Sequence, residues 1–335
     1  MPKNIVVFSD GTGQEGGKGF STNVYKLFNM VEDRTPNQIA FYDRGLGTGW
    51  RKLSGNAFGY GISENIRECY EFIFENYEAG DQVYLFGFSR GAFTVRSLSG
   101  MIELFGILPK SRKELIKAAY KIYKIKDRQQ RLAKKDEFLS LHHSMKCPIK
   151  VVGVWDTVDA LGIPVKALDI INPFKHAFHD TNMCQNVEYG YHALSIDDQR
   201  KVFHPTLWDE RNAASGQTVE QVWFAGVHTD VGGGYEQRGL SDITLDWMVK
   251  KVTPQGLRIY PNHNVRTAPN ADGHMHDPRG GIGRFYRKAQ RKLDPRIVTT
   301  RVHQSVLDRK PDRFNNPNSK YDPWILQHSH TVEPW

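Results

Sequence analysis

The stretch DQVYLFGFSRGAFTVRSLSG, residues 81–100, decides the fold of this chain. A run of apolar residues from Val83 leads into the sequence Gly-x-Ser-x-Gly around Ser89, and a helical pattern follows to about Met101. This context predicts a strand that turns sharply into a helix, with the serine hydroxyl raised at the turn. We therefore predict that Ser89 is a nucleophile. The alternative is an incidental serine at a place where a strand meets a helix.

The rest of the chain repeats this alternation of apolar runs and helical patterns. Apolar residues at helical spacing predict a helix over residues 60–77. Short apolar runs that end in polar loops predict strands at residues 5–8, 38–42, 149–155 and 222–227. Together they predict an α/β fold with a mainly parallel sheet and helices on both faces. In such sheets the chemistry gathers beyond the carboxyl ends of the strands.

A serine nucleophile needs a base, and the base needs an acid that orients it. On this fold the expected chain order is Ser, then Asp or Glu, then His. Asp156 follows the predicted strand at 149–155, and His228 follows the one at 222–227, just before a glycine-rich loop. We predict Ser89, Asp156 and His228 as the catalytic residues.

Two other residues compete for these roles. His192 is the main alternative to His228, but no strand is apparent before it and no glycine loop follows it. Asp159 is the nearest competitor of Asp156, and it lies three residues further into the loop, where a structural role is expected.

An oxyanion needs backbone donors beside the nucleophile. The N–H of Arg90 is the first candidate, and the N–H of Gly11 or Thr12, in the loop after the first predicted strand, is the second. Asp10 is expected to order that loop by accepting its N–H groups. A metal ligand is the alternative role for Asp10, but no matching cluster of ligands accompanies it. We expect no cofactor.

Five motifs stand in the order found in one known family, at residues 8–12, 87–92, 154–158, 192–197 and 224–235. From about residue 3 to 250 the chain resembles the α/β-hydrolase domains of unknown function that include phospholipase effectors of the bacterial type VI secretion system. The resemblance implies ester hydrolysis, of phospholipid acyl chains among others, by Ser89, Asp156 and His228. It also implies an ester or phospholipid substrate and a secretion-system or immunity partner.

We expect a single domain over residues 1–335, with a helical insertion at 104–147 and a loop-rich extension at 254–335. Residues 109–150 hold 13 Lys or Arg and 4 Asp or Glu, a net charge of +9 that accounts for the +8 of the whole chain. This segment is either a solvated helical face or a patch for an anionic membrane surface. We expect the insertion to cover the site as a cap that favours anionic or interfacial substrates. No nucleic-acid-binding signature accompanies it, so nucleic acid is not an expected partner.

Apolar runs, the N-terminal sequence and the cysteines indicate the cellular compartment to expect. No run of about 18 apolar residues is present, and the N-terminus lacks the pattern of a signal peptide. The three cysteines lie far apart, which argues against a disulfide scaffold. We expect a protein that is cytoplasmic as synthesised and that a type VI system could export.

Two other classes of protein are weaker interpretations. Residues 11–16 match Gly-x-Gly-x-x-Gly after a first strand, as in dinucleotide-binding proteins, but the next helix is predicted to begin only near Thr22 or Asn23. A binding module that keeps the hydrolase fold without activity is the other alternative, although no catalytic residue is visibly lost.

Overall fold

The computed structural model describes residues 2–11, 20–45, 55–158, 181–280, 286–294, 296–297, 299–311 and 319–335. Its strands are β1 (Asn4–Ser9), β2 (Arg34–Thr35), β3 (Gln38–Asp43), β4 (Gln82–Phe88), β5 (Ile149–Trp155), β6 (Val187–Ser195), β7 (Thr218–Phe224), β8 (Arg301–His303) and β9 (Thr331–Glu333). Its α-helices are α1 (Asn23–Phe28), α2 (Gly55–Asn76), α3 (Arg90–Phe105), α4 (Glu114–Tyr123), α5 (Arg128–Leu141), α6 (His228–Gly232), α7 (Gly239–Val252) and α8 (Gln304–Asp308). The strand predicted at 222–227 ends earlier, at Phe224.

Within the described ranges the strands form one sheet in the order β2-β3-β1-β4-β5-β6-β7-β8-β9. Neighbouring strands are parallel from β3 to β9, and β2 is antiparallel to β3. The predicted α/β fold with a mainly parallel sheet is therefore confirmed.

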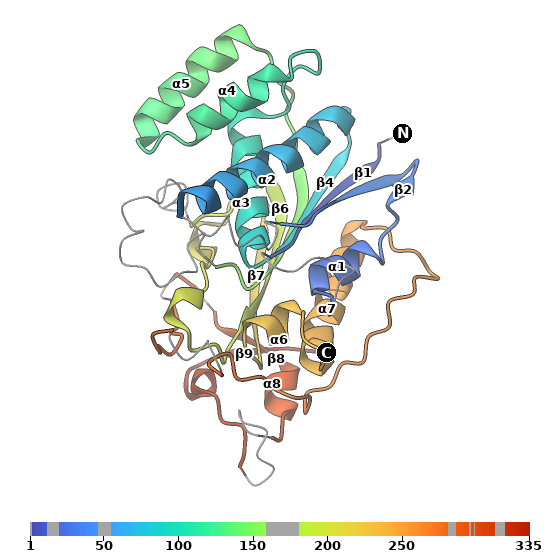
Figure 1. Cartoon of the computed structure of the whole chain (residues 1–335), viewed down its shortest axis with the longest axis vertical. Helices are drawn as coiled ribbons and strands as arrows, with labels where there is room; N and C mark the ends of the chain where they lie inside the picture. Colours follow the sequence, from blue (N-terminus) through green and yellow to red (C-terminus); the bar gives the residue numbers. More distant parts are fainter. Residues whose placement is uncertain are drawn as a thin grey trace.

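Helices cover both faces of the sheet (Figure 1). Successive side chains of a strand point to opposite faces, and β1 shows how this divides the core. Ile5 and Val7 belong to the apolar cluster that α2 and α3 complete, whereas Val6 and Phe8 belong to the cluster that α1 and α7 complete. A strand buried on both faces needs apolar residues at consecutive positions, and this is the pattern that made the strands recognisable in the sequence.

The parallel arrangement brings three loops together at one edge of the sheet. Ser89 directly follows β4, and Asp156 directly follows its neighbour β5. His228 begins α6 four residues after β7, which β6 separates from β5. The fold therefore gathers the three predicted catalytic residues although they are far apart in the sequence.

The insertion at 104–147 forms helices, as predicted, but it is not a cap over Ser89. Its two ends pair through Ile107 and Met145 at the C-terminal end of α3, and α4 and α5 pack on α2, α3 and each other. The 16 residues of α3 separate this base from the turn at Ser89 by about 24 Å. Figure 1 shows α4 and α5 at the end of the molecule opposite to α6 and α8. Because α3 runs antiparallel to β4, a segment inserted after α3 leaves from the far edge of the sheet.

The C-terminal extension contributes to the sheet. Most of its described residues are irregular, as expected, but β8 pairs with β7 and β9 pairs with β8. These strands have three residues each, too short for a periodic pattern in the sequence.

Three further predictions concern single features. Helix α1 begins at Asn23 with Thr22 as its N-cap, where the sequence predicted a helix start. No disulfide joins Cys69, Cys147 and Cys184. Within the described ranges, no helix combines the length and apolar character needed to cross a bilayer.

Candidate active site

Ser89 stands on a strained turn between β4 and α3. Its backbone has φ 58° and ψ −118°, a conformation that a residue with a side chain adopts only when its surroundings impose it, at a cost of about 1–3 kcal/mol. Among the described non-glycine residues, positive φ occurs only at Ser89 and at Asp156, where φ is 39°. The two strained positions are therefore two of the three predicted catalytic residues.

The two glycines of the motif are required by close packing at this turn. A Cβ atom on Gly87 would lie 2.5 Å from the carbonyl oxygen of Gly91, and one on Gly91 would lie 1.9 Å from the carbonyl oxygen of Ser9. Backbone atoms cannot move aside as the end of a flexible side chain can. The turn therefore passes directly against the end of β1.

We expect Gly91→Ala to destabilise the protein by more than about 3 kcal/mol, above the usual cost of overpacking, because the new methyl group would overlap the backbone of β1. Urea unfolding measures the change. Gly100→Ala in the same helix is the matched control, since the atoms nearest to its Cβ would belong to the Tyr123 side chain, at 3.1 Å and beyond, and not to the backbone. Equal stability of Gly91→Ala and the wild type would contradict the packing described here.

The structure brings Ser89, His228 and Asp156 into one hydrogen-bonded chain. His228 Nε2 lies 2.8 Å from Ser89 Oγ, and His228 Nδ1 lies 2.6 Å from Asp156 Oδ2. All three residues are buried. This is the connectivity by which a serine passes its proton to an imidazole that a carboxylate orients.

Aromatic rings and a second acid hold His228 in place. The ring of Phe88 lies 4.6 Å and the ring of Phe203 4.9 Å from the imidazole, centroid to centroid. The backbone N–H of His228 donates to Asp198 Oδ2 at 3.2 Å. Burial lowers the pKa of His228 below its ordinary value, and the hydrogen bond and charge of Asp156 partly oppose that change. Burial therefore favours the neutral imidazole, which is the form that acts as a general base.

Asp156 is held by donors on both carboxylate oxygens. Oδ1 accepts from Ser195 N–H at 3.1 Å and from Arg291 Nη1 at 2.6 Å. Oδ2 accepts from Arg291 Nη2 at 2.7 Å in addition to His228. Burial alone would raise the pKa of Asp156, but the charge and hydrogen bonds of Arg291, followed by those of His228, outweigh burial and hold it well below its usual range.

Arg291 was not predicted from the sequence. It lies in the irregular extension, in a basic stretch with no periodic pattern, and no local signal links it to Asp156. Phe203 and Asp198 were likewise missed, although Asp198 directly follows the motif at 192–197.

His192 does not reach Ser89. It lies inside β6, so the prediction that no strand precedes it was wrong. Its Nε2 accepts the N–H of Thr157 at 3.1 Å, which leaves the ring proton on Nδ1, 3.3 Å from Gln221 Oε1. Burial, the largest cause, lowers the pKa of His192 to about 3. Both ring nitrogens of His192 therefore have hydrogen-bond partners in the fold, Thr157 and Gln221, which is a structural role. Asp159, the other competitor, lies outside the described residues.

The predicted oxyanion donors divide into three cases. Arg90 directly follows Ser89 as the first residue of α3. Gly11 lies beside the nucleophile, since a Cβ on it would be 3.5 Å from Ser89 Cβ, but its N–H donates to Asp10 Oδ1 at 2.8 Å. The amide of Gly11 is therefore occupied by Asp10 in this structure. Thr12 lies outside the described residues.

Asp10 accepts three hydrogen bonds at the start of this loop. Besides Gly11 N–H, the donors are Thr22 Oγ1 at 2.5 Å and Tyr42 Oη at 2.6 Å. Burial, the largest cause, raises the pKa of Asp10 to about 6 although these donors oppose it. These contacts fit the predicted ordering role. Within the described ranges no group of three or more His, Cys, Asp or Glu is arranged to hold a metal ion.

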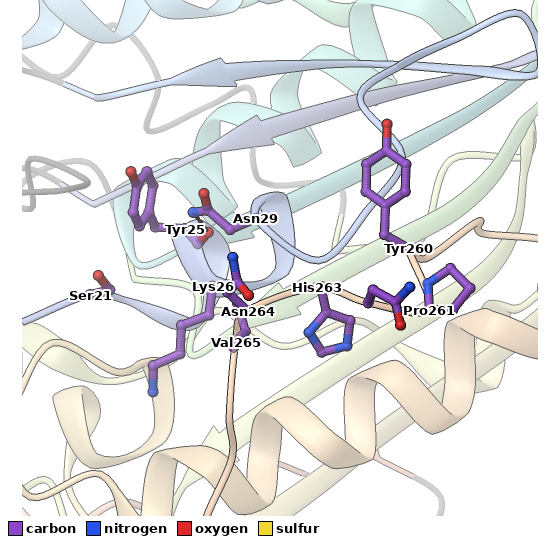
Figure 2. A pocket seen from close by; sticks show the side chains of 10 residues that line it. Ser21, Tyr25, Lys26, Asn29, Tyr260, Pro261, His263, Asn264 and Val265 are labelled. Atoms are coloured by element: carbon purple, nitrogen blue, oxygen red, sulfur yellow. Dashed lines mark hydrogen bonds between the residues drawn. The ribbon is translucent and has the colours of Figure 1, made fainter.

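A hollow of about 600 Å³ lies away from these residues, between α1 and residues 260–265 of the extension (Figure 2). Tyr25, Lys26 and Asn29 line it on one side and His263 on the other. Lys26 is already paired with Asp242 at 2.7 Å. None of the catalytic candidates lines this hollow.

Comparison with known proteins identifies the family. The sequence profile described as "T6SS, Phospholipase effector Tle1-like, catalytic domain" matches residues 3–251. The chain therefore belongs to this family of hydrolases, as the motifs indicated.

Individual relatives are more distant. An uncharacterized protein of Saccharomyces cerevisiae is 30% identical over 226 residues, which are 60% of this chain and 32% of that protein. An uncharacterized protein from Pseudomonas aeruginosa has 15% identity and a TM-score of 0.44, over 79% of this chain and 48% of its own. The Tle1 effector bound to the VgrG spike of the type 6 secretion system has 18% identity and a TM-score of 0.41, over 71% of this chain and 52% of its own. This chain thus spans about a third to a half of the length of these relatives.

Proposed function

We propose that this chain is a serine hydrolase that cleaves carboxylic esters through Ser89, His228 and Asp156. The observation that supports the proposal most is the hydrogen-bonded chain from Ser89 Oγ through His228 to Asp156. His228 takes the proton of Ser89 as the serine attacks the ester carbonyl, and the imidazolium then protonates the leaving alcohol. Water attacks the acyl-enzyme by the same route in reverse and releases the acid.

The oxyanion of each tetrahedral intermediate needs donors beside Ser89. We assign one to the N–H of Arg90 and the second to the loop after β1, near Gly11. The bond from Gly11 N–H to Asp10 must open if Gly11 itself is the donor, which leaves the next amide of the loop as the alternative. One such donor is worth about 3 kcal/mol of transition-state stabilisation.

We propose phospholipids as the substrate class on the basis of the family to which the chain belongs. A secretion-system partner is proposed on the same basis. The exposed basic residues of α4 and α5 are a candidate contact with an anionic membrane surface.

The test is covalent labelling with a fluorophosphonate probe, followed by mass spectrometry of the modified peptide and by assays on short acyl esters and phospholipid vesicles. We expect modification at Ser89 and release of fatty acid from the vesicles. Short-ester hydrolysis without fatty-acid release would support the esterase chemistry and contradict the phospholipid substrate. An unlabelled wild-type protein would instead favour a silent binding module.

A further inference from the structure

Arg291 reaches the candidate active site from the C-terminal extension, beyond residues 3–251, which the family profile matches. Its side chain has no exposed surface. Nη1 lies 2.6 Å from Asp156 Oδ1 and Nη2 lies 2.7 Å from Asp156 Oδ2, so that the guanidinium and the carboxylate meet as two parallel forks. This two-pronged geometry fixes orientation as well as charge.

The same two nitrogens also hold the backbone around the site. Nη1 donates to the carbonyl oxygen of Ser195 at 2.6 Å, and Nη2 donates to that of Phe203 at 2.7 Å. Phe203 is the residue whose ring packs against His228. One guanidinium therefore joins the end of β5, the end of β6 and the segment that supports the imidazole, which the three rotating donors of a lysine cannot do in a fixed plane.

The position of the carboxylate decides the position of the base. Asp156 Oδ2 accepts from Arg291 and from His228 Nδ1, so a rotation that breaks the fork also displaces the oxygen that orients the imidazole. The extension is anchored beside this point by further contacts. Ala289 N–H donates to the carbonyl oxygen of Gln199 at 2.8 Å, and Lys288 pairs with Arg200 across a β-bridge.

We propose that Arg291 is a positioning residue of the active site, which fixes the Asp156 carboxylate in the plane that orients His228. The C-terminal extension is then a functional part of the hydrolase, because it supplies the cation that balances the buried acid. This inference rests on the proposed function.

Arg291 lowers the pH at which the Asp156–His228 pair takes up a proton. With Arg291 in place, the negative charge of Asp156 is balanced, and the Asp156–His228 pair stays unprotonated down to lower pH. Without the guanidinium, the buried acid is unbalanced and the pair takes up a proton at higher pH, which removes the base. A cation at this distance shifts such a titration by about 1–3 pH units.

The experiment compares Arg291→Met and Arg291→Lys with the wild type through kcat and KM as functions of pH. We expect the acid limb of the Arg291→Met profile to rise by about 1–3 pH units. Arg291→Lys keeps the charge and loses the fork, so we expect kcat on the plateau to fall by about 10- to 100-fold, the range seen for outer-shell partners, with KM nearly unchanged.

Arg309→Lys is the matched control. Arg309 is a second buried arginine of the extension, and its Nη1 donates to the carbonyl oxygens of Ala271 and Gly273, both at 2.7 Å. A residue that only ties down the extension changes stability and leaves the pH profile unmoved, which is the result expected for Arg309→Lys. If Arg291→Met folds and its pH profile matches that of the wild type, the inference is overturned. If Arg291→Met does not fold, the inference is overturned when Arg291→Lys has the kcat and the pH profile of the wild type.

A second measurement separates this inference from the proposed function. NMR titration of the His228 imidazole reports proton uptake by the pair without any turnover. Absence of fluorophosphonate labelling in the wild type would refute the hydrolase proposal, while the titration would still test Arg291. An upward shift in Arg291→Met supports the positioning role in either case, and an unchanged titration contradicts it.

Discussion

Ser89→Ala is expected to lower kcat for ester hydrolysis by about a million-fold, the loss measured when the serine of a Ser-His-Asp triad is removed. The Ser89 hydroxyl is the group that meets His228 Nε2, at 2.8 Å, so its removal leaves the base without the nucleophile it activates. We expect KM to change little, because a single oxygen atom is lost. Initial rates on a short acyl ester, with the fold checked by circular dichroism, give both constants.

The companion variants test whether the residues act as one unit. His228→Ala is expected to cost about as much as Ser89→Ala, and the double variant no more than either, because members of a triad are strongly non-additive. Ser97→Ala is the matched control, since Ser97 is a buried serine of α3, the helix that follows Ser89, and its hydroxyl donates to the carbonyl oxygen of Phe93 at 2.9 Å. Residual hydrolysis by Ser89→Ala at more than a thousandth of the wild-type rate would show that another group attacks the ester.

The sequence predicted the parts of the fold and site that local chemistry determines. Val83 to Phe86 are apolar because β4 is buried on both faces, and Gly91 is a glycine because β1 passes within contact distance. Asp156 and His228 could be selected because each follows an apolar run, and parallel strands end at one edge of the sheet.

Predictions failed or were absent where the determinant is a contact between distant segments. Arg291 meets Asp156 across 135 positions, in a segment whose conformation is set by what it packs against. The strand around His192 was missed because tyrosine, glycine and histidine interrupt its apolar pattern, although β6 is central in the sheet. The prediction that the insertion covers the site was wrong. The position of the insertion depends on where α3 ends in the fold, and neither charge nor periodicity in the sequence encodes that position.

Asp156→Asn is expected to lower kcat by about ten-thousand-fold, as the same change does in other serine triads. The amide that replaces the carboxylate favours the wrong tautomer of His228, with the proton on the nitrogen that should accept from Ser89. In this protein we expect a second effect, because Arg291 loses its anion while it remains fully buried. Breaking a buried ion pair from one side costs about 3–5 kcal/mol, which urea unfolding will measure.

The double variant Asp156→Asn/Arg291→Met separates the two effects. Removal of the unpaired guanidinium is expected to restore part of the lost stability, since a neutral pair of similar volume avoids the cost of burying one charge. Activity is expected to stay at the level of Asp156→Asn, because the imidazole still lacks the carboxylate that orients it. If the double variant is less stable than Asp156→Asn, Arg291 stabilises the fold mainly through the carbonyl oxygens of Ser195 and Phe203. Its charge would then matter less than its hydrogen bonds to the backbone.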